Sequence, residues 1–219
     1  MPRRNAREIP AAARKIARSS RACQGSVHSP TMPTVMPIAR AAMNESPRDA
    51  ASLVGSGPAR RIEVPILSQV PGLAHLFTVR GSDARAALAE SMGRPVPLLS
   101  LRQVHGADVR VVDGRALPAD PGGTLRPPAA EEGAAQVVAE PGLAVGVWVA
   151  DCVPVLICDE TTRTAAAIHA GWRGTAKGIV GAAIAVLRSR YGADAGALRV
   201  ALGPSIGPCC FEVGNEVAE

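Results

Sequence analysis

Three short segments in the second half of the chain are almost wholly apolar, and polar or turn-forming residues separate them. They are Leu143–Val149, Val153–Cys158 and Thr164–Ile168. Continuous apolar runs of this length, rich in Val, Ile and Ala, are typical of strands that are buried on both faces. The pattern therefore predicts three strands inside the core of a folded domain.

Strand and helix patterns alternate around this core. Apolar positions recur with helical spacing in 174–190, and this helix is expected to stop at Gly192. A shorter helix is expected from Ser82, as its cap, to about Met92. Further strands are predicted at Ile62–Leu67, Ala74–Val79, Leu98–Val104, Asp108–Val112 and Leu198–Leu202, and a surface loop at 114–133. This order predicts a layered α/β (α+β) sandwich in a single domain, with parallel or mixed strand pairing left open.

The charge of the chain is unevenly distributed. The 219 residues include 24 basic and 19 acidic side chains, a net charge of +5. Ten basic and three acidic residues fall within 1–60, so this segment carries +7 and residues 61–219 carry −2. All aromatic residues lie after residue 76, which leaves 1–60 little with which to build a core. We predict a disordered basic extension over 1–60 and a folded domain over 61–219.

The extension has two functional alternatives. A basic arm could bind nucleic acid, and Ala11–Ala22 has the Arg- and Ala-rich composition of an organelle transit peptide. An upstream extension of low information content, or a misplaced start, is the simpler interpretation. No apolar run approaches the roughly 18 residues that span a bilayer, and an odd number of cysteines without a secretory signal indicates reduced thiols. We therefore expect a cytoplasmic protein with no nucleic-acid or membrane partner.

Three polar residues interrupt the apolar framework at the ends of predicted strands. They are His105, Cys152 and His169, and each has a small or turn-forming neighbour that allows close approach to the backbone. Two imidazoles and one thiolate are a suitable ligand set for zinc, with a fourth position open to water or substrate. Taken singly, a turn histidine, a strand cysteine and a hydrogen-bonded buried histidine explain the three equally well. The prediction of a metal site depends on all three together.

A second candidate element is the segment Gly171–Lys177 at the start of the predicted long helix. Free backbone N–H groups and the positive end of the helix dipole favour an anion at such a position. Arg173 and Lys177 lie one turn apart and could add positive charge. A solvated helix end is the slightly simpler interpretation of the segment alone. Next to His169, however, it could hold phosphate against a metal site.

Four motifs follow one another along the chain. They are Gln103-Val104-His105-Gly106, Ala150-Asp151-Cys152-Val153-Pro154-Val155-Leu156, His169-Ala170-Gly171-Trp172-Arg173-Gly174, and the segment 203–214 that begins Gly203-Pro204-Ser205-Ile206-Gly207-Pro208. Together they resemble the YfiH-like family of laccase-domain proteins, over about residues 62–219. Members of that family have been called polyphenol oxidases, peptidoglycan editing factors and, later, zinc-dependent purine nucleoside phosphorylases with adenosine deaminase activity.

The resemblance implies a fold, a reaction and a set of site residues. The fold would be a layered α/β sandwich with a mixed sheet, similar to cysteine-hydrolase-like toxin and deamidase domains. His105, Cys152 and His169 would be the zinc ligands and catalytic residues. Apart from the resemblance, we expect Asp151 to orient one of these ligands. The substrates would be phosphate and a purine nucleoside of the adenosine, inosine or guanosine type. Substrate and phosphate contacts are expected from Arg80, Gln103, Arg173 and Lys177.

Several alternatives accompany this reading. The stretch Phe77–Gly81 continues directly into Ser82 without a loop that is usual in the family, and the family's C-terminal portion is not evident after Glu219. An inactive, truncated family member is therefore one alternative. Another is a metal-independent cysteine hydrolase or amidase of peptidoglycan precursor editing, with Cys152 as nucleophile and His169 as base. Copper is disfavoured, because multicopper sites need many histidines in close pairs and only three lie outside the extension.

Overall fold

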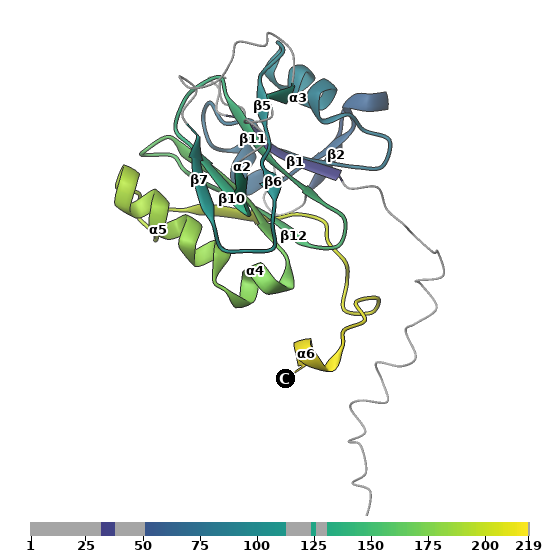
Figure 1. Ribbon diagram of the computed structural model, residues 1–219. Coiled ribbons are helices and arrows are strands. Elements are labelled where there is room, and N and C mark those ends of the chain that lie inside the picture. The colour runs from purple at the N-terminus through teal and green to yellow at the C-terminus, as the bar shows by residue number, and fades with distance from the viewer. Residues whose placement is uncertain (1–31, 38–50, 113–123, 126–130, 219) are drawn as a thin grey trace, which may run out of the picture. The chain divides into compact units, whose positions relative to one another are not determined.

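The computed structural model describes residues 32–37, 51–112, 124–125 and 131–218 (Figure 1). The chain divides into two compact units. One is formed by Met1–His28 with Ile206–Glu219, and its described part contains helix α6 (Asn215–Ala218). The other is Ser29–Ser205, which contains all other described helices and strands. The architecture below is that of this larger unit.

Two large sheets dominate the larger unit. Within the described residues, one sheet has the strand order β2-β3-β4-β1-β11-β5-β8 and the other β14-β12-β13-β10-β7, while β6 pairs with β9. The strands are β1 (Met32–Pro37), β2 (Ser52–Val54), β3 (Arg61–Glu63), β4 (Leu76–Thr78), β5 (Leu98–Leu99), β6 (Arg102–Gln103), β7 (Val109–Val112), β8 (Thr124–Leu125), β9 (Glu132–Gly133), β10 (Ala135–Val138), β11 (Ala144–Val149), β12 (Val153–Asp159), β13 (Thr164–Ala170) and β14 (Arg199–Leu202). The helices are η2 (Gly57–Ala59), α2 (Pro65–Ser68), α3 (Ala84–Met92), α4 (Trp172–Ala176) and α5 (Ile179–Tyr191). Both sheets mix parallel and antiparallel pairs, which confirms a mixed α/β fold.

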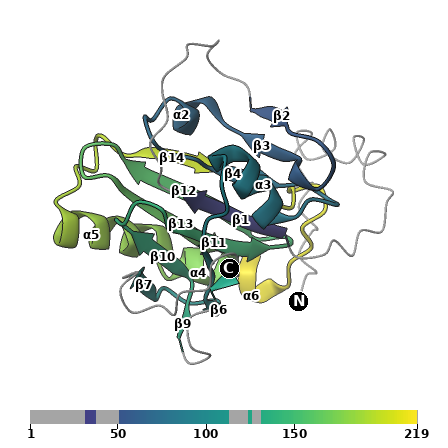
Figure 2. The same ribbon diagram turned by 90° about the horizontal axis from the view of Figure 1, so that it is seen from above.

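The sheets pack face to face, and a helix covers the outer side of each (Figure 2). Strand β13 shows why. Ala165 and Ala167 belong to the core between the sheets, whereas Ala166 and Ile168 pack against α5. Successive side chains of a strand point to opposite faces, so a strand that is apolar at every position is buried on both. On the other sheet, α3 packs against β4 and β5 through Leu88.

The three central strands are confirmed: they are β11, β12 and β13, and nearly all of their residues are buried. The predicted long helix is instead two helices. Gly178 has a φ of +79°, a left-handed conformation that ends α4 and precedes α5. The predicted strand Ile62–Leu67 is wrong in its second half, because Pro65 starts the helical turn α2. Helix α3 is capped by Asp83, whose side chain accepts a hydrogen bond from the Ala86 amide, rather than by Ser82.

One strand of the core was not predicted at all. Strand β10 follows the expected loop directly and is buried at all four positions, including Gln136. Its Ala and Gln residues produce neither an apolar run nor an alternating pattern, so tertiary packing decides its structure. The expected loop 114–133 also contains β8 and β9, while 114–123 and 126–130 lie outside the described residues.

Ordered structure begins before residue 61. Strand β1 pairs with β11 and β4, and β2 pairs with β3. The predicted disordered extension spans 1–60; its described parts, 32–37 and 51–60, contain β1, β2 and η2, whereas 1–31 and 38–50 lie outside the described residues. The likeness to cysteine-hydrolase domains stays a prediction.

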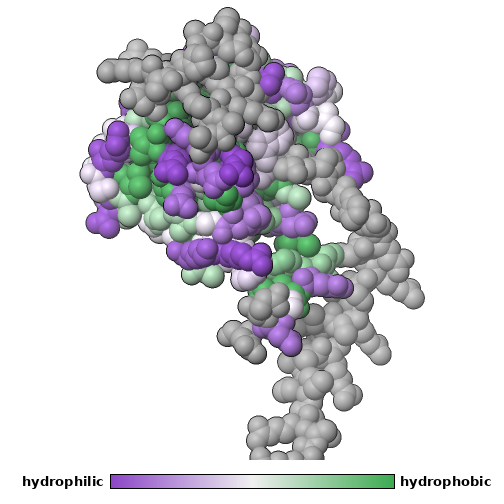
Figure 3. Space-filling view, viewed as in Figure 1, coloured by the Kyte–Doolittle hydropathy of each residue, from purple (hydrophilic) through white to green (hydrophobic). Residues whose placement is uncertain are grey.

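The surface shown in Figure 3 mixes hydrophilic residues with smaller groups of hydrophobic ones. None of the helices in the described part of the chain combines the length and the apolar character that a membrane span requires.

Candidate metal centre

The three predicted ligands lie together. One ligand atom from each of His105, Cys152 and His169 lies within 4.8 Å of the others, so the described chain contains a group that could hold a metal ion. The two imidazole rings meet edge to face, with their centroids 4.9 Å apart and their planes at 66°. Residues distant in sequence thus present two nitrogens and one sulfur to a common point.

Two of these ligands come from one β-hairpin. In the antiparallel pair β12–β13, Val153 lies opposite Ala170 and Pro154 opposite His169. Cys152, which directly precedes β12, is therefore brought beside the end of β13. Alternation along β13 places His169 on the same face as Ala165 and Ala167, which pack between the sheets. The site thus lies at the end of the core between the two sheets, where Cys152 also packs.

Gly171 has no side chain, and the space that one would fill is occupied by Cys152 and His105. A Cβ atom built on this residue would lie 2.9 Å from the Cys152 Sγ and 3.0 Å from the His105 Cδ2. Both separations are shorter than normal van der Waals contact, so any side chain here would displace a ligand. The small neighbour noted in the sequence is therefore a steric requirement of the site.

Backbone hydrogen bonds fix the third ligand relative to the hairpin. His105 lies in the loop between β6 and β7, and the Val104 amide beside it donates to the Gly133 carbonyl at 3.3 Å. The His169 amide donates to the Ala134 carbonyl at 2.8 Å. One stretch of backbone, Gly133-Ala134, thus binds both histidine segments.

The three candidate ligands differ in how exposed they are to solvent. His105 is exposed, Cys152 is half-buried, and His169 is 5% exposed. Burial, aided by the nearby His105, lowers the pKa of His169, so its ring is neutral at pH 7 as a ligand must be. Its Nδ1 is buried and has no hydrogen-bond partner within the described chain. An unsatisfied buried nitrogen beside a thiol and a second imidazole is the arrangement that a metal ion would complete.

Within the described chain, the surroundings of the Cys152 thiol likewise lack a positive charge that would favour the thiolate. Burial, and then the negative charge of Asp151, raises the pKa of Cys152. A cation between the ligands would reverse this effect and favour the thiolate. Tetrahedral zinc, with Zn–N about 2.0 Å and Zn–S about 2.3 Å, needs ligand atoms roughly 3.3–3.5 Å apart. The ligand atoms here lie within 4.8 Å of one another, and His105 is the exposed member of the group.

The other predicted site residues lie in varied settings. Arg80 is exposed in the turn after β4, and Lys177 is exposed at the C-terminal cap of α4. The exposed Arg173 stacks its guanidinium 4.2 Å from the centroid of the Trp172 ring. The side-chain amide of Gln103 forms two hydrogen bonds with the backbone of Trp148. Sequence reasoning missed this partner, since nothing in the order of residues links the two.

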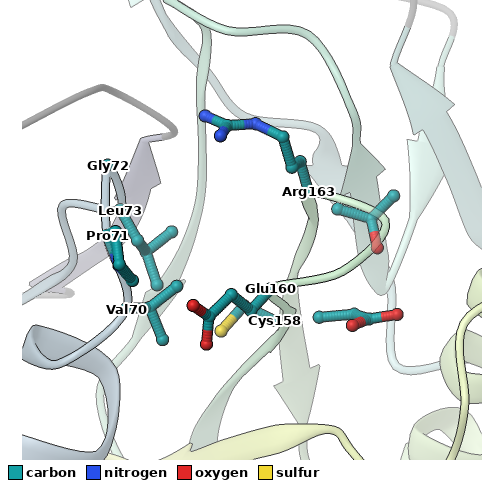
Figure 4. Close-up of a pocket in the computed structure, with 9 residues that line it drawn as sticks. Val70, Pro71, Gly72, Leu73, Cys158, Glu160 and Arg163 are labelled. Atoms are coloured by element: carbon teal, nitrogen blue, oxygen red, sulfur yellow. The ribbon is translucent and has the colours of Figure 1, made fainter.

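A different small pocket lies at the opposite end of the β12–β13 hairpin (Figure 4). The turn Val70–Leu73 faces Cys158 and Glu160 there, and Arg163 lies above them. Burial raises the pKa of the Cys158 thiol to about 12, so this cysteine is protonated and unreactive at neutral pH. The chemistry of the hairpin is therefore concentrated at its Cys152 end.

Residues 79–219 match the family described as multi-copper polyphenol oxidoreductase laccase, and the chain belongs to that family. The predicted family is thereby confirmed.

Its relatives carry more specific names. The chain is 40% identical over 145 residues, 64% of its length and 53% of the relative's, to adenosine deaminase RL5 of an unknown prokaryotic organism. It is 40% identical over 134 residues, 61% of its length and 51% of the relative's, to purine nucleoside phosphorylase SCO2081 of Streptomyces coelicolor. To purine nucleoside phosphorylase YfiH of Escherichia coli it is 37% identical over 119 residues, 54% of its length and 43% of the relative's. The chain thus spans about half the length of the curated relatives it matches.

Solved structures agree on the fold. YlmD from Geobacillus stearothermophilus matches 61% of this chain and 49% of its own, with a TM-score of 0.51 and 30% identity. The hypothetical protein YfiH from Bacillus licheniformis matches 61% of this chain and 50% of its own, with a TM-score of 0.53 and 25% identity.

Proposed function

We propose that this chain is a zinc-dependent enzyme of purine nucleosides, which transfers the ribosyl group of adenosine, inosine or guanosine to phosphate. The observation that carries the proposal is the convergence of His105, Cys152 and His169 on one point. The names of the relatives, purine nucleoside phosphorylase and adenosine deaminase, support the substrate class. Deamination of adenosine is proposed as a side activity, and the cytoplasm as the location.

The donor set supports zinc over copper. Among the described residues, the third histidine is His75, which lies elsewhere and accepts a hydrogen bond from the Val64 amide through Nε2 at 2.7 Å. Two histidines and one thiol then remain for a metal, too few for the clustered histidines of a multicopper oxidase. They fit a catalytic zinc site with three protein ligands.

In the proposed reaction, the bond between the sugar carbon and the purine nitrogen breaks, and a phosphate oxygen bonds to that carbon. A bound zinc ion would supply a Lewis acid that polarises an oxygen of phosphate or water. His169, kept neutral by burial, and Cys152 would hold the ion from the enclosed side, while the exposed His105 would hold it at the entrance. Arg173 and Lys177, on the helix that follows Gly171, are proposed phosphate contacts, and Arg80 a proposed nucleoside contact.

The test combines metal content with base release. Purified full-length protein should contain zinc, and should release free base from adenosine or inosine only when phosphate is present. His105→Ala should remove most of the zinc and of the base release while circular dichroism stays unchanged. His75→Gln, a histidine substitution away from the centre, is the matched control and should keep both. Unchanged base release in His105→Ala would refute the proposal.

A metal-independent cysteine hydrolase or amidase acting in peptidoglycan precursor editing is the second candidate, because Cys152 and His169 lie together. A nucleophilic cysteine needs a lowered pKa, whereas burial raises that of Cys152. Stoichiometric zinc that is lost in Cys152→Ser would therefore reject this candidate, and an active, zinc-free enzyme that Cys152 alkylation inactivates would establish it. Zinc binding without turnover of any nucleoside would instead indicate an inactive family member.

A further inference from the structure

Gln103 connects the two backbone segments that carry His105 and Cys152. Its Nε2 donates to the Trp148 carbonyl at 2.7 Å, and its Oε1 accepts from the Trp148 amide at 2.5 Å. Gln103 lies two residues before His105, and Trp148 lies four residues before Cys152. A single half-buried side chain therefore ties together two stretches of chain that each lead directly into a ligand.

The Gln103 side chain makes the hydrogen bonds to β11 that a neighbouring strand would otherwise make. Strand β11 pairs with β1 at Trp148, but its parallel pairing with β5 is confined to Ala144 and Val145. Beyond that point the β5 side of β11 would have an unpaired amide and carbonyl. A glutamine amide carries the same donor and acceptor as a peptide unit, so Gln103 satisfies both groups of Trp148 at once.

The other ligand segments are held in the same way. As described above, Gly133 accepts from the Val104 amide and Ala134 accepts from the His169 amide. The backbone pair Gly133-Ala134 thus sets His105 against His169, and the Gln103 amide sets His105 against Cys152. Breaking the second link would leave the His105 loop bound to Gly133-Ala134 but no longer tied to the segment that leads to Cys152.

We propose that Gln103 is a positioning residue, which sets the separation of His105 and Cys152 and thereby the affinity of the centre for its metal. The inference rests on the proposed metal-dependent function. It gives Gln103 a role in holding the site, in place of the substrate contact expected from the sequence. Partners behind metal ligands commonly change metal affinity by about 10- to 100-fold when they are altered.

The experiment measures zinc and cobalt affinity of the full-length protein by competition with a chromophoric chelator, together with the cobalt absorption spectrum. Gln103→Glu keeps the acceptor for the Trp148 amide but sets a carboxylate against the Trp148 carbonyl. It should weaken binding about 10- to 100-fold and alter the thiolate–cobalt band. The matched control is Gln69→Glu, the same substitution at an exposed position after α2, which should leave both unchanged. Gln103→Met, of similar length, replaces Gln103→Glu if that variant does not fold.

The outcomes separate the two proposals. Wild-type protein that binds neither metal refutes the metal-dependent function itself. Wild-type binding with unchanged affinity and spectrum in a folded Gln103 variant overturns the positioning role alone, and a raised KM for nucleoside in that variant would restore Gln103 as a substrate contact. A lowered unfolding free energy with unchanged metal affinity also overturns it, because it reduces the residue to ordinary structural support.

Discussion

Two buried histidines, His75 and His169, differ in whether their ring nitrogens find hydrogen-bond partners. They are 2% and 5% exposed, and burial lowers the pKa of each. His75 accepts a hydrogen bond from a backbone amide, whereas the Nδ1 of His169 lacks a partner and faces a group that contains another imidazole and a thiol. Burial and a lowered pKa therefore do not identify a site. What distinguishes His169 is an unsatisfied nitrogen beside a second imidazole and a thiol, which together could hold a metal ion.

The largest expected effect is a loss of folding stability in acid, caused by His75. Burial, and then the positive charge of Arg61, lowers the pKa of His75 from 6.5 to about 4. The folded state then binds fewer protons than the unfolded state between these values, so its stabilising contribution is complete above pH 6.5 and is lost as the pH falls to about 4. The loss is at most roughly 3 kcal/mol. Urea unfolding across this range should show it.

His75→Gln tests the assignment, because glutamine keeps an acceptor for the Val64 amide but does not titrate. Its unfolding free energy should fall less steeply with acid than that of the wild type, while zinc content is unchanged. Equal slopes in the two proteins would mean that His75 is not responsible, and lost zinc would mean that the two histidines are not separate.

The next effect concerns the space beside His169. Gly171→Ala places a methyl group against Cys152 and His105 and should weaken zinc binding about 100-fold, which equals about 2.7 kcal/mol. The matched control is Gly181→Ala in α5, where an added Cβ meets nothing within 4 Å. That change should raise the unfolding free energy by roughly 0.5–1 kcal/mol and leave zinc binding intact. Full zinc affinity in Gly171→Ala would show that the ligands are not held as described.

The smallest expected effect concerns the turn of the β12–β13 hairpin, where polar side chains form hydrogen bonds with one another. Thr162 Oγ1 bonds to Asp159 Oδ2 at 2.9 Å and to Thr164 Oγ1 at 2.8 Å. Thr162→Val should therefore lower the unfolding free energy by about 1 kcal/mol. Calorimetry would measure this, and zinc affinity should not change. A fall in zinc affinity would mean that the two ends of the hairpin are coupled.

The sequence predicted those parts of the molecule in which one residue pattern has one physical meaning. The apolar runs of β11, β12 and β13 could only be buried strands or buried helices, and their length decided between these. Gln136 hid β10, because a polar residue is not expected in a buried strand, and its Nε2 finds its partner across the sheets, where it donates to the Gly146 carbonyl at 2.8 Å. Only folded contacts reveal such a partner.

The three candidate ligands were predicted through motifs, and the structure brings their ligand atoms to within 4.8 Å of one another. His105, Cys152 and His169 were expected together, although their spacing alone was compatible with three unrelated residues. The role of Gln103 could not be predicted, because Trp148 offers only its backbone and any residue has one. Gly178 misled the helix prediction, since a glycine within an apolar helical pattern can continue the helix or end it.

The pairing of Pro154 with His169 has one more consequence, for protein quality control. A slip of this hairpin by a single residue would send Cys152 and His169 to different faces and destroy the chelating group. Under the proposed function, zinc uptake would then be restricted to molecules whose strands have paired in the native alignment. In a preparation that looks uniform by size and secondary structure, the fraction of chains that take up metal would measure how many were assembled correctly.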